Sequence, residues 1–258
     1  MSQGPQHNPF AVPATRVEDV HFASSGNLAS EPRQVPAGNG TAWIAGGWTM
    51  FKRAPGTWIG IYVALMVIMF ALSMVPLVNL IANLLFPVFM GGIALGCKAL
   101  DDGDEIQFSH LFAGFQNNVG QLAMVGVLYL AGMVAIGAVV AVLAAVFIGA
   151  GMSAGLSALP VLGTALVVLI GVLLAFPLGM AMWFAPTLVI LGGVPAWDAI
   201  KLSFTGSLRN IMPFLLYSLV LLVLGVLAII PAMLGTLVLG PVVFGSIYMA
   251  YRDIYLEP

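Results

Sequence analysis

Six long apolar stretches alternate with short polar segments along the chain. They cover about residues 57–75, 78–99, 119–149, 161–191, 211–230 and 233–254. A helix needs roughly 20 mostly apolar residues to cross the hydrocarbon core of a bilayer, and the stretches approach or exceed that length. The alternation of apolar and polar residues that is typical of outer-membrane β-strands is absent. The pattern therefore predicts an all-α integral membrane protein with six transmembrane helices.

The third and fourth stretches are longer than a bilayer requires. Each is near 30 residues, which is about 45 Å of straight helix, whereas the hydrocarbon core is roughly 30 Å thick. We therefore expect both helices to tilt, break or project from the membrane. Pro177 and Pro186 are the predicted break points in the fourth helix, and residues 149–160 mark a flexible turn between the two helices.

The first 40 residues differ from the rest of the chain. They are rich in Pro, Gly, Ser, Asn and Gln and have no apolar period, a composition typical of disordered segments. We expect residues 1–40 to form a disordered cytoplasmic tail and residues 41–258 to form the six-helix transmembrane domain. No signal peptide is expected, because the first 30 residues contain no apolar core of the needed length.

The few charged residues lie at one end of every predicted hairpin. The chain has 8 Lys and Arg against 10 Asp and Glu, which together make up only 7% of its residues. None of them lies between the first and second, third and fourth, or fifth and sixth helices. Because Lys and Arg beside spanning segments stay cytoplasmic, both termini are expected in the cytoplasm, with the chain in the bacterial inner (plasma) membrane. The net charge of −2 suggests no nucleic-acid partner.

Similar residues recur around three prolines. The stretches from Pro87 and Pro241 share a following valine and then a glycine, an isoleucine and a basic residue at matching positions. The stretch from Pro177 shares mainly the proline. We infer three hairpin repeats, each preceded by a short interfacial amphipathic helix, with an insertion in the second unit. Hairpins of equal orientation are related by an axis along the membrane normal. All three prolines are predicted helix breaks.

Aromatic residues at helical spacing precede each predicted hairpin. Phe108, Leu111, Phe112 and Phe115 follow the spacing i, i+3, i+4 and i+7, which is one face of a helix. Such a stripe is typical of a helix in the membrane surface with its rings at the level of the lipid headgroups; contact with a partner helix is the alternative. The predicted interfacial anchors are Trp48, Phe51, Phe108, Phe112, Phe115, Trp197 and Phe204.

Small residues recur every four positions in the third predicted helix, at Gly137, Ala141, Ala145 and Gly149. Small residues at this spacing let two membrane helices approach closely. We therefore predict a helix-packing face here. It would serve either within the chain or between chains, in a homo-oligomer or with another membrane protein.

The segment ALDDGDEIQF contains four carboxylates, at Asp101, Asp102, Asp104 and Glu105. A calcium loop needs a glutamate at its twelfth position, but the twelfth residue from Asp102 is Ala113. A solvated turn also does not separate two carboxyl pKa values as acid–base catalysis requires. We interpret the cluster as a hydrophilic stop after the second helix.

The sequence predicts no catalytic, cofactor-binding or metal site. Cys97 is the single cysteine, and His7, His21 and His110 are isolated. No nucleophile, phosphate-loop or dinucleotide motif is present. The expected function is therefore a non-enzymatic membrane component that binds lipid or a partner protein. The alternative is a transporter or channel for a small or lipidic substrate, with a cavity between the hairpins.

Several blocks of the sequence together resemble a proteobacterial family of uncharacterised six-helix inner-membrane proteins. The blocks are GWTMFKRAPGTWIG, ALGCKALDDGDEIQFSHLFAGF, MAMWFAP, LRNIMPFLLY and LGPVVFGSIYMAYRDI, and they span about residues 36–255. The resemblance implies an inner-membrane location and no established activity, so no functional residue is carried over. More weakly, the hairpin layout is similar to the membrane domain attached to some glycerophosphodiester phosphodiesterases, whose soluble catalytic domain is not expected in this chain.

Overall fold

The computed structural model describes residues 27–257 except residues 75 and 155–157. Within this part the chain is all-α, with one isolated bridge between Leu28 and Leu256. The helices are α1 (Asn39–Arg53), α2 (Pro55–Ser73), α3 (Pro76–Asp101), the 3₁₀ helix η1 (Phe108–Phe115), α4 (Val119–Ala154), α5 (Ala158–Trp183), α6 (Ala185–Gly192), α7 (Ala196–Arg209), α8 (Ile211–Ile229) and α9 (Thr236–Tyr255).

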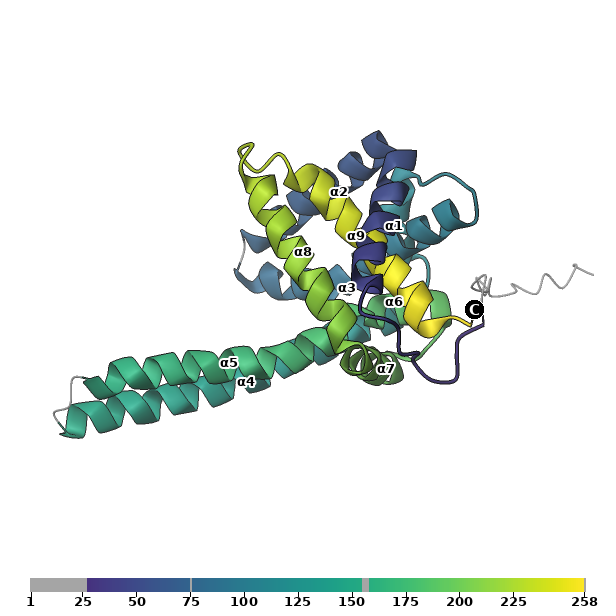
Figure 1. Cartoon of the computed structure of the whole chain (residues 1–258). Helices are drawn as coiled ribbons and strands as arrows, with labels where there is room; N and C mark the ends of the chain where they lie inside the picture. Colours follow the sequence, from purple (N-terminus) through teal and green to yellow (C-terminus); the bar gives the residue numbers. More distant parts are fainter. Residues whose placement is uncertain (1–26, 75, 155–157, 258) are drawn as a thin grey trace, which may run out of the picture.

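Six segments of the described chain are long and apolar enough to span a membrane. They lie in α2, α3, α4, α5 with α6, α8 and α9. The prediction of an all-α membrane protein with six spanning helices is confirmed. In Figure 1 the hairpins α2–α3, α4–α5 and α8–α9 all turn toward the left of the view, whereas the C-terminal end of α9 lies at the right. We call this second end the charged end, because the Lys, Arg, Asp and Glu residues that flank the helices lie there.

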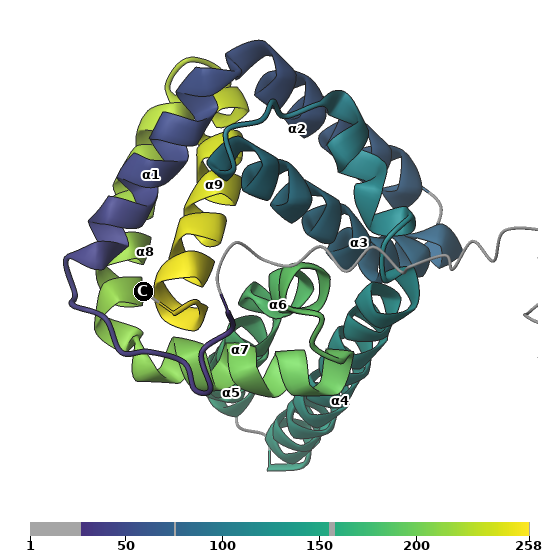
Figure 2. The ribbon, with the colours of Figure 1, turned by 90° about the vertical axis from the view of Figure 1, so that its right-hand side faces the viewer.

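Each short helix packs on the second long helix of a neighbouring hairpin. The helix η1 packs on α3, α7 packs on α5 and α6, and α1 packs on α9 and α8. The contacts therefore close into a ring, which Figure 2 shows with α1 at its edge and α6 near its middle. A short helix precedes a hairpin three times in the described chain. The internal repeat and the interfacial position of the short helices stay predictions.

Two of these contacts are so close that only glycine fits. A Cβ atom at Gly47 of α1 would overlap the carbonyl of Val242 in α9, and one at Gly114 of η1 would overlap the carbonyl of Val88 in α3. Val242 and Val88 each follow the proline inside their helix. Close backbone contact of this kind is a main source of helix association in membranes.

The third contact uses a serine instead of a glycine. Ser203 of α7 donates a hydrogen bond to the carbonyl of Met180 at 2.8 Å and accepts one from the Phe184 N–H at 3.0 Å. Ser203 and Phe184 are both fully buried. The side chain therefore satisfies backbone groups at the point where α5 ends and α6 begins.

The break in the fourth spanning segment is at Phe184, and Pro186 follows it in the first turn of α6. The first turn tolerates proline because its N–H groups have no partner inside the helix. The predicted break at Pro186 is therefore confirmed. The predicted breaks at Pro87, Pro177 and Pro241 were wrong, because α3, α5 and α9 continue through them. Neighbouring groups in a membrane protein can satisfy the backbone that such a proline frees.

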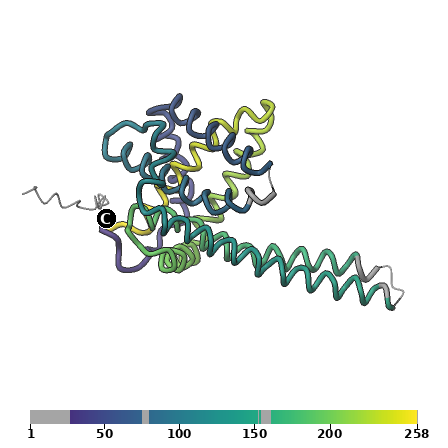
Figure 3. The backbone as a smooth tube through the Cα atoms, turned by 180° about the vertical axis from the view of Figure 1, so that it is seen from behind, coloured from purple at the N-terminus to yellow at the C-terminus, as the bar shows by residue number. Residues whose placement is uncertain are grey.

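The hairpin α4–α5 projects from the remaining helices, as Figure 3 shows from behind. Helix α4 has 36 residues, which is about 54 Å of straight helix. The predicted packing residues Gly137, Ala141, Ala145 and Gly149 are all exposed. Packing of this face between chains stays a prediction, because the described part of the chain does not cover it.

Candidate functional site at the charged end

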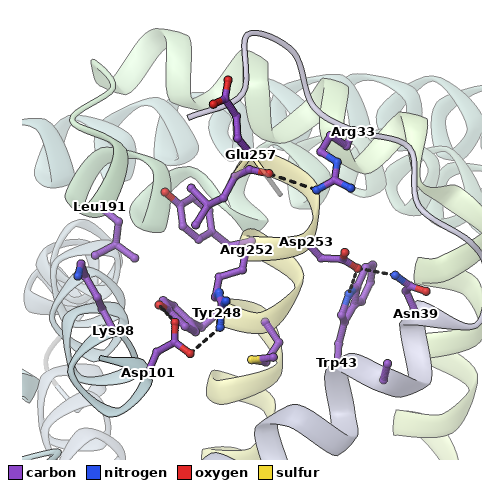
Figure 4. Close-up of a pocket in the computed structure, with 14 residues that line it drawn as sticks. Arg33, Asn39, Trp43, Lys98, Asp101, Leu191, Tyr248, Arg252, Asp253 and Glu257 are labelled. Atoms are coloured by element: carbon purple, nitrogen blue, oxygen red, sulfur yellow. Dashed lines mark hydrogen bonds and ion pairs between the residues drawn. The ribbon is translucent and has the colours of Figure 1, made fainter. Parts of the chain in front are cut away.

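A pocket of about 450 Å³ opens at the charged end and is lined mainly by residues of α1, α3 and α9, with Leu191 of α6 and Arg33. Figure 4 shows its charged side chains converging from separate elements. Its polar lining includes Arg33, Asn39, Trp43, Lys98, Asp101, Tyr248, Tyr251, Arg252 and Asp253. The sequence analysis did not group these residues, which are far apart in the chain.

Asp101, the last residue of α3, links that helix to α9. Its Oδ1 atom accepts a hydrogen bond from Arg252 at 2.5 Å, and its Oδ2 atom accepts one from the Tyr248 hydroxyl at 3.1 Å. Tyr248 and Arg252 are four residues apart, so both side chains lie on one face of α9. The interpretation of the acidic cluster as a solvated stop is therefore wrong for Asp101. Asp104 and Glu105 are exposed, in agreement with it.

Residues 27–38 form an extended strap across the charged end. The Ala29 N–H donates to the carbonyl of Tyr255 and the Arg33 N–H to the carbonyl of Ile254, both at 2.8 Å. The N–H of Glu257 donates back to the carbonyl of Asn27 at 3.0 Å. The predicted disordered tail is thus corrected for these residues, whereas residues 1–26 lie outside the described part. Local composition did not reveal bonds made to the distant end of α9.

Asn210 holds the strap in place. It is fully buried between α7 and α8. Its Oδ1 atom accepts from the Val35 N–H at 2.9 Å, and its Nδ2 donates to the carbonyls of Arg33 at 2.8 Å and Gly206 at 2.9 Å. Our sequence analysis gave Asn210 no structural role. The available signal was a lone asparagine at the junction between an amphipathic helix and a spanning helix.

Three charged residues of the pocket have no oppositely charged partner among the described residues: Arg33, Asp253 and the exposed Glu257. The Arg33 guanidinium donates to the carbonyl of Leu256 at 3.3 Å. The Asp253 carboxylate accepts from two neutral donors, Asn39 Nδ2 at 2.7 Å and Trp43 Nε1 at 2.9 Å, and both bonds fall on Oδ2. None of the three forms an ion pair there.

Tyr251 adds an unsatisfied donor to the same pocket. Its side chain is 1% exposed, and within the described chain its hydroxyl has no hydrogen-bond partner. A buried polar group without a partner costs free energy comparable to a lost hydrogen bond. The pocket therefore presents an arginine and two carboxylates without ion-pair partners among the described residues, and its lining residue Tyr251 retains a buried, unused donor.

The predicted interfacial anchors fall into two groups. Trp48, Phe108, Phe112, Phe115 and Trp197 are 37–60% exposed, and we call them the aromatic rim. Phe51 is a correction, because it is only 6% exposed and belongs to the apolar core. Phe204 is half-buried. Phe51 is buried because it lies on the face of α1 that also carries Trp43, Gly47 and Met50, and this face packs on α8 and α9.

The short helix η1 is a 3₁₀ helix. It buries Leu111 and Gly114 against α3. The N–H of Gln107 donates to Nδ1 of His110 at 2.9 Å and so caps the first turn. Partial burial lowers the pKa of His110. The cap therefore depends on a neutral imidazole at this position.

Comparison with known proteins gives one informative relative. The chain is 26% identical over 250 residues to a protein described as a "probable inner membrane protein" of Burkholderia thailandensis, with 86% of this chain and 93% of that protein covered. No family model matches the chain, and no solved structure matches it. The description of this relative agrees with the expected inner-membrane location and names no activity. The weaker resemblance to the membrane domain of glycerophosphodiester phosphodiesterases finds no support.

Proposed function

We propose that this chain is a non-enzymatic component of the bacterial inner membrane that binds membrane lipid along the aromatic rim, with both termini in the cytoplasm. The observation that carries the proposal is the exposure of the rim at the charged end. Aromatic rings are enriched at the level of the lipid headgroups, where an apolar body and a polar surrounding are both available.

Helix α7 is the clearest part of this rim. It buries a face of small residues, including Ala199, Ser203 and Gly206, against α5 and α6. Trp197 and Leu208, near the two ends of α7, are 60% and 50% exposed, whereas Phe204 between them is half-buried. The Lys201 ammonium lies 5.6 Å from the centre of the Trp197 ring. The exposed face of α7 resembles an interfacial helix, whose rings enter the lipid while its cation stays near the headgroup phosphates.

The interior of the bundle favours lipid binding over transport. The buried side chains form one apolar cluster that runs from Val35 to Leu256 and includes Trp58, Ile93 and Phe184. A passage for a polar substrate would require polar groups along its length. Transport remains the second candidate, and the pocket lined mainly by α1, α3 and α9 at the charged end is what favours it.

Quenching by brominated lipid tests the proposal. The protein is reconstituted with lipids brominated either near the headgroup or near the chain end, and Trp197 emission is taken as the difference between the wild type and Trp197→Phe. We expect stronger quenching by the shallow bromine, because the Trp197 ring should lie at headgroup depth. Equal emission with brominated and ordinary lipid would contradict the proposal.

Trp183→Phe provides a matched control. Trp183 is the last residue of α5 and is 38% exposed, but it packs edge-on against Phe214 and Tyr217. Its emission should change less with the depth of the bromine than that of Trp197.

A further inference from the structure

The charged residues of the pocket divide into those that are neutralised and those that are not. Arg252 is paired with Asp101, and Lys98 is paired with Asp102. Arg33 and Asp253 have no ion-pair partner in the described part of the chain. Glu257 also lines the pocket without an ion-pair partner in that part, but it is exposed, whereas Asp253 is half-buried. The pocket thus contains one unpaired cation, Arg33, and one half-buried unpaired anion, Asp253.

We infer that this pocket binds a small zwitterion with a phosphate and an amine, of the phosphoethanolamine type. The phosphate would lie against Arg33, and the ammonium would lie against Asp253. A ligand of this class neutralises both residues at once, whereas a simple anion or a simple cation would leave one of them uncompensated.

The geometry at Arg33 suits a phosphate. A guanidinium has five N–H donors in a planar fork that matches phosphate oxygens. Among the described residues, one side-chain donor of Arg33 is used, by the carbonyl of Leu256. Tyr251 also lines the pocket, and its buried hydroxyl has no partner within the described residues, so this residue retains an unused donor. The strap holds Arg33 in place through its own N–H and carbonyl, bonded to Ile254 and Asn210.

The geometry at Asp253 suits an ammonium. Its two hydrogen bonds both fall on Oδ2, which leaves Oδ1 to accept from the ligand. Trp43 Nε1 and Asn39 Nδ2 fix the orientation of the carboxylate without neutralising its charge, because both are uncharged donors. Asp253 lies one helical turn before Leu256, whose carbonyl holds Arg33, so the two charged groups flank one pocket.

The size and depth of the pocket agree with such a ligand. A volume of about 450 Å³ lies in the range of roughly 300–1,000 Å³ typical of small-molecule sites. The expected depth of the pocket in the membrane rests on the proposed function, because the aromatic rim would place this end of the bundle at the lipid headgroups. The ligand could therefore be the headgroup of a zwitterionic lipid or a soluble molecule of the same chemistry.

Calorimetric titration tests the inference. The full-length protein is placed in nanodiscs of phosphatidylglycerol, which contain no amine, and is titrated with O-phosphoethanolamine, inorganic phosphate or ethanolamine. We expect phosphoethanolamine to bind at least tenfold more tightly than either of the other two. Arg33→Gln should lower that affinity at least tenfold. Asp253→Asn, which still accepts from Trp43, should remove the preference for phosphoethanolamine and leave the affinity for phosphate unreduced.

The source of the ligand follows from repeating the titration in nanodiscs that contain phosphatidylethanolamine. A lower apparent affinity for phosphoethanolamine in these nanodiscs shows that the lipid competes for the site and identifies its headgroup as the ligand. An unchanged affinity identifies a soluble zwitterion. Lys52→Gln, at an exposed position in the last turn of α1 outside the pocket lining, is the matched control and should leave the affinity unchanged. The inference is overturned if phosphoethanolamine does not bind the wild type, or if both pocket variants bind it normally. Failure of the rim proposal would show separately, in the quenching of Trp197.

Discussion

The Asp101 carboxylate at the end of α3 lies 2.5 Å from the Arg252 guanidinium near the end of α9. These two helices come from the first and the third hairpin. The pair therefore joins hairpins that are far apart in the chain. It also fixes one wall of the pocket, because Asp101 and Arg252 both line it.

Replacing Asp101 with Asn should destabilise the protein by about 1–3 kcal/mol, because charge-assisted bonds to Arg252 and Tyr248 are weakened. Asp104→Asn and Glu105→Gln, at exposed positions of the same cluster, should each cost less than about 0.5 kcal/mol. The free energy of unfolding can be measured by steric trapping in bicelles. An equal effect at all three positions would mean that Asp101 has no special role.

Gly47→Ala and Gly114→Ala should each destabilise the fold by about 1–3 kcal/mol, the usual range for overpacking. A methyl group at either position would overlap a carbonyl of the neighbouring helix. Gly137→Ala and Gly149→Ala are matched controls, because a Cβ there meets no atom within 4 Å. In these two variants the monomer should keep its stability. Loss of a dimer in Gly137→Ala would instead reveal packing between chains.

Asn210→Ala should release the strap. The substitution leaves the Val35 N–H and the Arg33 carbonyl without a partner, which costs about 1–3 kcal/mol for buried groups. Trypsin should then cleave after Arg33 faster than in the wild type. Thr205→Ala serves as the control, because Thr205 is bonded only to the carbonyl of Lys201 on its own helix. An unchanged cleavage rate in Asn210→Ala would show that the strap does not depend on this residue.

The cap of η1 should weaken in acid. The pKa of His110 is lowered by burial, so the unfolded state binds more protons and stability rises with pH. This contribution is complete above the ordinary histidine pKa of about 6.5 and is lost as the pH falls through the lower pKa of the folded state. Hydrogen exchange of residues 107–115 at pH 7.5 and pH 5, corrected for intrinsic rates, should show the loss. His110→Asn retains an acceptor without titrating, so its protection should not change with pH.

Cysteine labelling tests the orientation of the hairpins. Single cysteines at Ser153 and Met233, in a Cys97→Ser background, should react with an impermeant thiol reagent in intact cells, because the uncharged hairpin ends are expected in the periplasm. A cysteine at Glu257 should react only after the cells are opened. Labelling of Glu257→Cys but not Ser153→Cys in intact cells would reverse the topology.

The membrane class and the six spanning segments could be predicted from the amino-acid sequence alone. Their apolar length is a local property, and a bilayer accepts such segments only as helices that satisfy their own backbone. The same reasoning located the short aromatic segments before each hairpin. The prediction of Phe51 as an interfacial anchor was wrong, because apolar stripes that face lipid and apolar stripes that face protein have the same spacing.

Which helices meet and which charges converge could be seen only in the folded chain. Asn210 is an unremarkable residue in the sequence, yet it binds a strap more than 170 positions away. Asp101 could not be separated from its acidic neighbours, because its role depends on Arg252 in another hairpin. The physical reason is that ion pairs and buried hydrogen bonds depend on distances between groups in space, and the order of residues along the chain does not specify these distances.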